Sequence, residues 1–415
     1  MNNSNNKGYS RRNFIKKTAL SVAGGITLQG GLPANAIGGE RKFGFAAQPV
    51  LANVSPTKIE IIVAPNELAT GWVEYGTAEE LDSTVERTVD GRFQFSNRVL
   101  HFELNDLKPG SKYHYRVHLQ RVVFHSKRRM ERTEKVSSQL YNFYTLDPDG
   151  DTASFTCWND THEDKKTIKR LNELLDEQKP DFLVWNGDVT NDIFEEEQIV
   201  GQFLNPADQS YATSTPVMYS RGNHDVRGRD APHLQDYMTG PNGEYHYGFR
   251  QGPMACLVMD TGEDKPDNHI EYGGLADFAS YRSMQAEWLD QVIENSWFKT
   301  APYRIAFMHI PLVWNRSSKY REWDGECVGW ICEDAYNKWH DLLIKAEVQL
   351  VVSGHTHRHA YIPPIEGRPY GQLVGGGPQP ERATCITGYA NDKAMTITMT
   401  DLDQNILKEI NFNKL

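Results

Sequence analysis

Short runs of alternating hydrophobic and polar residues dominate the chain between residues 49 and 146. Lys58–Val63, Val99–Leu104 and Ser111–Val117 all show this pattern, and Pro109-Gly110 supplies a turn between the last two. A period of two residues is typical of strands with one buried face, bounded by turn residues. Residues 49–146 are therefore predicted to form a small all-β domain.

From about residue 154 the pattern changes to apolar runs that alternate with helical spacing. Phe155–Trp158 and Phe182–Trp185 are continuous apolar runs, and Lys165–Gln178 between them repeats apolar residues every three to four positions. The alternation returns near Arg304–Met308 and Val348–Val352. Strand, helix and strand in this order predict an α/β domain, which we place over residues 150–415.

The predicted strands of this second region end in residues that bind metal ions. α/β sheets place their ligands at the carboxyl ends of strands, so these side chains are expected to meet. Carboxylate, imidazole and amide oxygen suit divalent zinc, manganese or iron. The clusters are Asp160-Thr-His162, Gly187-Asp188, Gly222-Asn223-His224-Asp225, His309 and Gly354-His355-Thr-His357.

This ordered set resembles the calcineurin-like metallophosphoesterases over roughly residues 154–360. The resemblance implies an α/β fold, a β-sandwich flanked by helices, and two divalent metal ions. It also implies the ligands. The first ion would be held by Asp160, His162 and His357, the second by Asn223, His309 and His355, and Asp188 would bridge the two.

The same resemblance implies a mechanism. Two ions lower the pKa of a bridging water, and the resulting hydroxide attacks phosphorus. His224 corresponds to a family histidine near the leaving oxygen, where an imidazolium donates a proton or a hydrogen bond. Part of the family orients this histidine with an Asp, at a position that is Asn191 here. Purple acid phosphatases have Tyr at that position, so a purple ferric site is not expected.

Residues 49–146 resemble the fibronectin type III domain that precedes the catalytic domain in purple acid phosphatases and their relatives. The resemblance rests on the Leu-x-Pro-Gly-x-x-Tyr-x-Tyr-Arg-Val pattern of residues 107–117, which many sandwich domains share. A small all-β domain of another topology is the alternative.

The N-terminus has the order of a secretory signal. Arg11 and Arg12 precede a moderately apolar run, and Ala34-Asn35-Ala36 offers a cleavage site. The paired arginines resemble the twin-arginine type, which predicts a signal peptide over 1–36, a linker over 37–48 and a periplasmic or extracellular protein. An amphipathic or disordered basic tail is the alternative.

Charge narrows the class of substrate. The formal net charge is −11, and removal of the five basic residues of 1–36 would take it to −16. An acidic protein repels polyanions, so a nucleic acid substrate is not expected. We predict hydrolysis of a small phosphomonoester, with a phosphodiesterase as the close alternative and a non-catalytic metal-binding scaffold as the alternative of another class. No later stretch has the roughly 18 apolar residues of a membrane span.

Substrate contacts are predicted from position alone. Arg221 and Arg227 flank the Asn223-His224 pair and are candidates to hold phosphate oxygens, although arginines are often simply ion-paired. Asn191 and Trp323, the latter in an aromatic insertion after His309, are further candidates. Cys327 and Cys332 either form one small disulfide loop or remain thiols. Gly375–Pro378 is predicted to be a turn near the rim of the site.

Overall fold

The computed structural model describes residues 42–314 and 333–415, and Phe43–Leu415 forms one compact unit. The predicted signal peptide, together with Trp323, Cys327 and Cys332, lies outside the described residues. Within the described ranges, no helix is both long and apolar enough to span a membrane.

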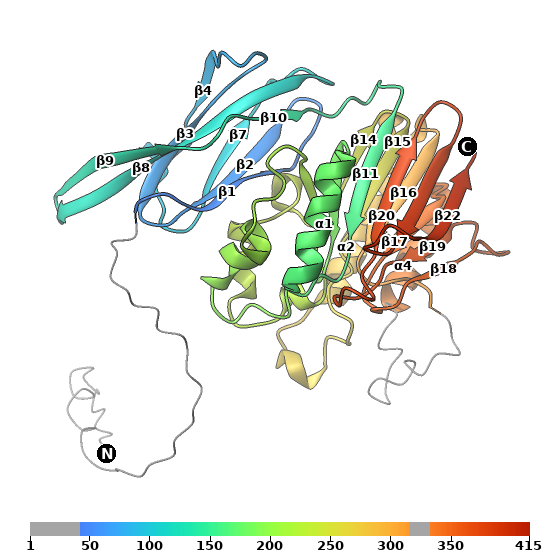
Figure 1. Ribbon diagram of the computed structural model, residues 1–415. Coiled ribbons are helices and arrows are strands. Elements are labelled where there is room, and N and C mark those ends of the chain that lie inside the picture. Colours follow the sequence, from blue (N-terminus) through green and yellow to red (C-terminus); the bar gives the residue numbers. More distant parts are fainter. Residues whose placement is uncertain (1–41, 315–332) are drawn as a thin grey trace, which may run out of the picture. The chain divides into compact units, whose positions relative to one another are not determined.

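The N-terminal strands form two antiparallel sheets, consistent with a sandwich (Figure 1). One sheet contains β1 (Phe45–Ala52), β2 (Ile59–Pro65) and β7 (Leu100–Leu104). The other has the order β10-β8-β3-β4, formed by β3 (Ala69–Gly76), β4 (Ser83–Val85), β8 (Lys112–Ser126) and β10 (Tyr141–Tyr144). β9 (Arg129–Ser137) pairs with β8, and β5 (Thr88–Val89) with β6 (Arg92–Phe93).

β1 starts inside the range that we predicted to be a linker. The strand begins at Phe45, so the end of the 37–48 segment belongs to a sheet. Most of the strand is buried, including Val50 and Leu51, which follow one another and point to opposite faces. The residues inside the predicted linker, Phe45–Gln48, are only partly buried and show no alternation of apolar and polar positions, so no strand was predicted there.

The C-terminal region is built on two sheets with helices outside (Figure 1). The first runs β22-β21-β20-β11-β12-β13 and continues through β1-β2-β7, and the second runs β14-β15-β16-β17-β19-β18. The first sheet's strands are β11 (Ala153–Trp158), β12 (Phe182–Asn186), β13 (Val217–Ser220), β20 (Cys385–Ala390), β21 (Met395–Thr400) and β22 (Ile406–Phe412). The second sheet's strands are β14 (Tyr247–Gln251), β15 (Met254–Met259), β16 (Tyr303–Met308), β17 (Leu350–Ser353), β18 (Ala360–Ile362) and β19 (Gly371–Val374).

Three hydrophobic clusters hold these layers together. Phe155 of the first sheet meets Phe307 of the second edge to face, with ring centroids 5.2 Å apart, in the core between the sheets. α1 (Lys165–Gln178) packs the leucine face predicted from its spacing against the outside of the first sheet. α2 (Phe278–Val292) and α4 (Glu333–Lys345) cover the second sheet, and α3 (Ser296–Lys299) is a single turn.

The N-terminal sandwich is joined to the first sheet by backbone and side-chain contacts. β1 runs parallel to β13, with Ala52 opposite Val217. The buried hydroxyl of Tyr115 donates to the carbonyl oxygen of Thr213 at 2.8 Å. Arg98 lies 2.6 Å from Glu196 in an ion pair. The first sheet of the C-terminal region therefore does not end at β13.

Candidate metal centre

The predicted ligands follow the carboxyl ends of five strands of the two sheets. Asp160 and His162 come after β11, Asp188 after β12, and Asn223 after β13. β16 and β17 belong to the second sheet, and His309 follows the former, while His355 and His357 follow the latter. Both sheets thus contribute ligands to one end of the sandwich.

The first predicted group converges as expected. Asp160, His162, Asp188 and His357 each offer a ligand atom within 4.8 Å of the others. The Nε2 atoms of His162 and His357 are 3.0 Å apart, and His162 Nε2 lies 3.3 Å from the carboxylate of Asp188. His357 Nε2 lies 3.6 Å from Asp160.

The second group shares Asp188 with the first. Asp188, His309 and His355 offer ligand atoms within 4.8 Å of one another. His309 Nε2 lies 3.1 Å from Asp188, and Nδ1 of His355 lies 2.9 Å from the amide oxygen of Asn223. Asp188 is the residue common to both groups, as its predicted bridging position requires.

The ligand atoms of the cluster are suited to binding a cation rather than to forming hydrogen bonds with one another. Nδ1 of His309 lies 3.0 Å from the carbonyl oxygen of Asn186, to which it donates, so in the neutral ring that binds a metal ion the lone pair is on Nε2. That buried Nε2 lies 3.1 Å from the Asp188 carboxylate but makes no hydrogen bond of good geometry. A backbone carbonyl that fixes the tautomer of a histidine in this way is the usual outer partner of a metal ligand. The described residues therefore fit divalent metal ions.

The electrostatics of the cluster show how unfavourable it is without a cation. Burial raises the pKa of Asp160, the charge of His309 lowers it and the charge of Asp188 raises it again. The resulting pKa is about 7. Burial lowers the pKa of His309, but the carboxylates of Asp188 and Asp160 outweigh it and raise the pKa to about 10. Burial and then the charge of His162 lower the pKa of His357 to about 4. Buried charges of this kind are normally paired or bound to metals.

Backbone strain is concentrated at the same residues. Five of the seven predicted ligands have φ between 42° and 70°, the left-handed region that non-glycine residues rarely adopt. Such conformations cost of order 1–3 kcal/mol each and cluster at functional sites. The strained ligands are Asp160, His162, Asp188, His355 and His357.

Two glycines allow the loops to approach so closely. A Cβ atom on Gly222 would lie 2.1 Å from the backbone nitrogen of Asp188, and one on Gly354 would lie 2.2 Å from the Asp160 carboxylate. The predicted turn at Gly375–Pro378 is also beside the site, since a Cβ on Gly377 would lie 2.7 Å from that of His357. These glycines are required by contact with ligands rather than by chain flexibility.

Asp225 holds the ligand loops in place, a structural role that was not predicted. Its buried carboxylate accepts hydrogen bonds from the backbone nitrogens of Val189, Thr190 and Gly222 at 2.9–3.2 Å and from the hydroxyl of Tyr219 at 2.8 Å. Asp225 adjoins the Asn223-His224 pair, and this adjacency was the available signal. It ties the loop after β12 to the loop after β13.

His224 lies beside the ligands with its ring fixed on both sides. Its backbone nitrogen donates to Asp188 at 2.9 Å, and its Nδ1 lies 2.7 Å from the carbonyl oxygen of Asn191. Nη1 of Arg227 lies 3.1 Å from His224 Nε2. Because a guanidinium only donates, a neutral ring protonated on Nδ1 satisfies both contacts. Burial lowers the pKa of His224, and Arg227 lowers it further, although Asp188 opposes this effect.

The role of Asn191 therefore differs from the one expected. Its backbone carbonyl orients His224, while its side-chain amide donates to the carbonyl oxygen of His162 at 3.3 Å. A backbone acceptor is available whatever side chain occupies this position. The uncharged side chain of Asn191 thus does not weaken the orientation of His224.

The two candidate arginines are both ion-paired. Arg221 is bound to Asp260 at 2.6 Å, and its guanidinium stacks 4.1 Å from the ring centroid of Tyr245. Arg227 pairs with Glu263 at 2.6 Å and with Asp264 at 2.8 Å. Of the two, the structure places only Arg227 in contact with His224.

Comparison with known proteins agrees with this geometry. Residues 153–359 match the calcineurin-like phosphoesterase family. A serine/threonine-protein phosphatase, CPPED1 of Pongo abelii, is 24% identical over 202 residues, which cover 47% of this chain and 59% of that protein. The chain thus spans less than two thirds of the length of this curated relative.

Two solved structures share the fold over most of the chain. A purple acid phosphatase, PPD1 of yellow lupin (Lupinus luteus), aligns with a TM-score of 0.64 at 14% identity, covering 88% of this chain and 74% of the other. PhoD aligns with a TM-score of 0.58 at 10% identity, and the alignment covers 89% of this chain and 90% of the PhoD chain. Through residues 153–359, the chain belongs to the calcineurin-like phosphoesterase family.

Proposed function

We propose that the protein is an exported phosphoesterase that hydrolyses a small phosphomonoester at a centre of two divalent metal ions. The observation that carries the proposal is the convergence of two ligand groups on the shared carboxylate of Asp188. Zinc, manganese or iron would be held there by the seven predicted side chains. When bound, two such ions supply a Lewis acid for the phosphoryl oxygens and activate water as a nucleophile.

The chain's own residues would bind and orient the substrate. His224 and Arg227 form a pair at the edge of the ligand cluster, with the His224 ring centroid 4.8 Å from that of His162. Arg227 is held by Glu263 and Asp264, so its N–H groups have a fixed direction. We assign this pair to the phosphoryl or leaving oxygen. A negatively charged phosphate would raise the pKa of His224 and favour its imidazolium form.

A monoester is proposed because the chain is acidic and because the fold likeness to the lupin purple acid phosphatase extends over the N-terminal strands. The grouping of β1, β2 and β7 in one sheet and of β3, β4, β8, β9 and β10 in another supports its assignment as fibronectin type III-like. The paired arginines Arg11 and Arg12 support twin-arginine export.

Paired chromogenic substrates test the reaction. Protein beginning at residue 37 would be stripped of metal and reloaded with zinc, manganese or iron, then assayed with p-nitrophenyl phosphate and bis(p-nitrophenyl) phosphate. Faster hydrolysis of the monoester is the expected result. Preference for the diester would establish the phosphodiesterase alternative. No turnover with any of the three metals would favour a metal-binding scaffold.

Export is tested separately in a bacterial host that has the twin-arginine pathway. The natural protein should appear in the periplasm or medium, starting after Ala36, while Arg11→Lys with Arg12→Lys should stay in the cytoplasm. Export of that double variant at the normal rate would contradict the assignment.

A further inference from the structure

An exposed apolar patch lies on the N-terminal sandwich, away from the ligand loops in sequence. Four side chains form it: Phe93, Phe95, Phe124 and Met130 are 36–59% exposed. The rings of Phe95 and Phe124 have centroids 6.3 Å apart. Exposed apolar groups are common singly, but a contiguous patch marks an interaction site.

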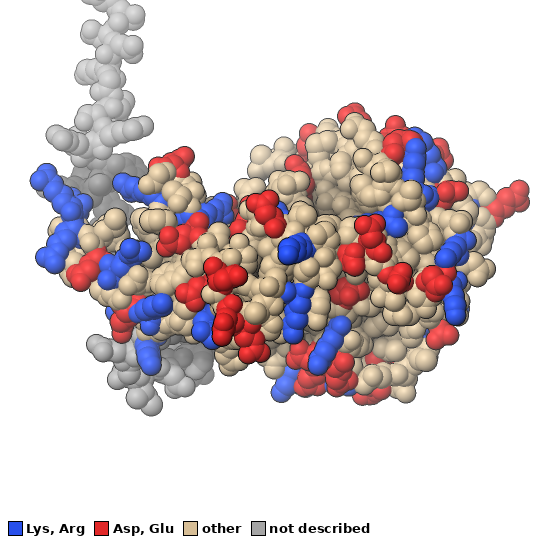
Figure 2. Space-filling model, turned by 90° about the horizontal axis from the view of Figure 1, so that it is seen from above, with Lys and Arg blue, Asp and Glu red and all other residues tan. Residues whose placement is uncertain are grey.

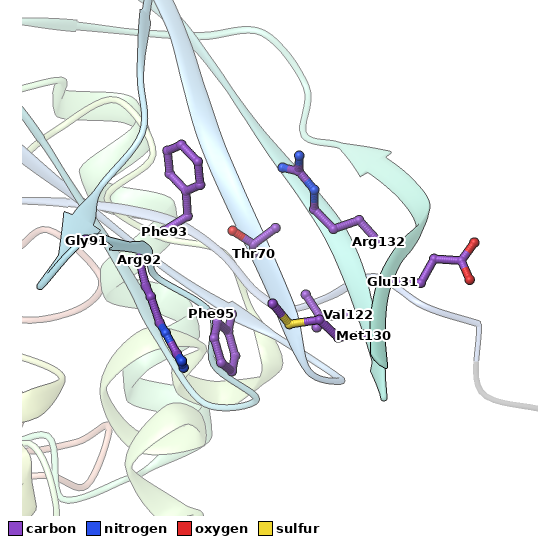
Figure 3. Close-up of a pocket in the computed structure, with 9 residues that line it drawn as sticks. All are labelled: Thr70, Gly91, Arg92, Phe93, Phe95, Val122, Met130, Glu131 and Arg132. Atoms are coloured by element: carbon purple, nitrogen blue, oxygen red, sulfur yellow. The ribbon is translucent and has the colours of Figure 1, made fainter. Parts of the chain in front are cut away.

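The patch surrounds a hollow with basic residues at its rim. The hollow has a volume of 450 Å³ and is lined by Phe93, Phe95 and Met130. Figure 3 shows the two phenylalanines of the β6 region on one side and Met130 of β9 on the other, with Arg92 and Arg132 flanking them. Apolar and cationic groups therefore face solvent together.

The basic character extends along the whole hairpin. Residues 112–137 contain eight Lys or Arg and two Glu, a net charge of +6 in a chain whose total is −11. Blue side chains predominate at the left of Figure 2, where Figure 1 places the β8–β9 hairpin. Among the described residues, Lys127, Arg128 and Arg132 have no ion-pair partner. Their charges are available to an external anion.

The hairpin also projects beyond its sheet. β3 pairs with β8 as far as Arg121, and the backbone nitrogen of Val122 still donates to the carbonyl oxygen of Leu68 at 2.8 Å, whereas residues 123–126 pair with β9 alone in the described structure. We call residues 122–132 the arm. Its four β8 residues beyond Val122, which pair with β9 alone, span about 13 Å. This exceeds the Debye length of about 8 Å at physiological ionic strength, so the arm is largely screened from the acidic remainder.

We propose that the arm and the neighbouring Phe93 and Phe95 dock the protein on an anionic lipid bilayer. Basic residues are attracted to anionic headgroups, and exposed aromatic and Met side chains enter the boundary between headgroup and acyl chain. A second copy of the chain fits less well, because two surfaces of charge +6 would repel each other. A long polyanion would run from the arm onto the acidic body, whereas a bilayer contacts the arm alone.

Vesicle sedimentation tests the proposal with the metal-loaded protein beginning at residue 37. Vesicles of phosphatidylcholine alone are compared with vesicles that also contain phosphatidylglycerol. Binding is expected only with phosphatidylglycerol, and 0.5 M salt should release the protein. Absence of binding, or equal binding to both vesicles, would overturn the proposal.

Two sets of substitutions separate charge from apolar insertion. Lys127→Ser, Arg128→Ser and Arg132→Ser together should weaken vesicle binding about 100-fold, given roughly 1 kcal/mol for each basic residue. Phe124→Ser with Met130→Ser should weaken it about 10-fold or more. Ile406→Ser, a 64% exposed side chain of β22, is the matched control and should bind normally.

Hydrolysis of p-nitrophenyl phosphate by every variant should equal that of the natural protein, which verifies folding and separates docking from catalysis. Vesicle binding unchanged by the three serine substitutions would refute the arm as the site. Binding unchanged by Phe124→Ser with Met130→Ser, together with equal retention on dextran sulfate, would mean that the arm attracts a soluble polyanion, and the bilayer proposal would fall.

Discussion

The two regions of the molecule use backbone conformation differently. In the N-terminal sandwich, the non-glycine residues with positive φ are Asn53, Asp90 and Asp106, which are residue types that tolerate turns. At the metal centre, histidines as well as aspartates adopt this conformation. The sandwich therefore follows local preferences, while the strand ends of the other region depart from them where ligands must converge.

Replacing Asp188 should give the largest effect, because it alone belongs to both ligand groups. Asp188→Ala should lose both metal content and nearly all phosphoesterase activity, measured by elemental analysis and turnover of p-nitrophenyl phosphate. Asp208→Ala, whose side chain is 80% exposed, is the control and should behave normally. Full activity of Asp188→Ala with two ions retained would refute the assignment of the site.

His224→Ala should lower turnover by about 100-fold or more while metal stays bound, since proton or hydrogen-bond donation to a leaving group contributes on this scale. The loss should be greatest for substrates with poor leaving groups, as determined from a series of substituted phenyl phosphates. His233→Ala, at a half-exposed position, provides the comparison. An equal loss for good and poor leaving groups would argue against donation to the leaving oxygen.

Gly222→Ala tests whether close packing of the strained loops is essential. The added Cβ would meet the backbone and carboxylate of Asp188, and overpacking of this kind typically costs 1–3 kcal/mol. We expect a lower midpoint of denaturant unfolding and weaker metal binding. Gly201→Ala is matched, because its Cβ would have no atom within 4 Å. Equal stability of both variants would show that the loops adapt freely.

Tyr115→Phe addresses the connection between the two regions. It removes the hydrogen bond to Thr213, which should lower the free energy of unfolding by about 1 kcal/mol. Activity should not change, because the hydroxyl is remote from the ligands in the fold. Tyr389→Phe, at a residue that is 49% exposed, should leave stability unaltered. The measurement is denaturant unfolding of the metal-free protein, where two separate transitions would show that the regions unfold independently.

Substitution of Glu60 should give the smallest change in protein stability. Burial raises its pKa, but His101 and Asn53 outweigh this and lower it below the usual 4.5. A lowered pKa contributes stability above pH 4.5, and the contribution disappears as the pH falls through the value in the folded state. Glu60→Gln should therefore reduce the stability of the metal-free protein at pH 7, and the difference from the natural protein should shrink as the pH falls below 4.5. Glu103→Gln, directly opposite on β7, is the control.

The sequence predicted most of the metal centre because its ligands directly follow apolar strands. Strand order indicated only that His309 and His355 follow apolar strands, and the resemblance to the calcineurin-like family placed them beside Asp188. The tautomer of His309 could not be predicted, because the acceptor for its Nδ1 is the backbone carbonyl oxygen of Asn186, 123 residues away in the chain. The ion pair of Arg221 could not be predicted either, because its partner Asp260 lies 39 residues further along the chain. Long-range pairing of this kind leaves no local pattern.

Some features of the fold were predicted from the sequence and others were not. The alternating strands and the leucine face of α1 were predicted from period, and the α/β class was confirmed. The start of β1 at Phe45 was missed because Phe45–Gln48 shows no alternation of apolar and polar residues. The projection of the arm beyond β3 was not predicted either, because polar, charged sequences do not indicate how far a hairpin extends.

The parallel pairing of β1 with β13 has a consequence for solubility. An uncovered edge strand exposes unpaired N–H and C=O groups that can recruit another chain. β13 is short and apolar, and β1 covers its outer side. The N-terminal sandwich thus helps to protect the phosphoesterase sheet from aggregation through its edge, and a truncated chain that starts near residue 148 would leave the outer side of β13 uncovered.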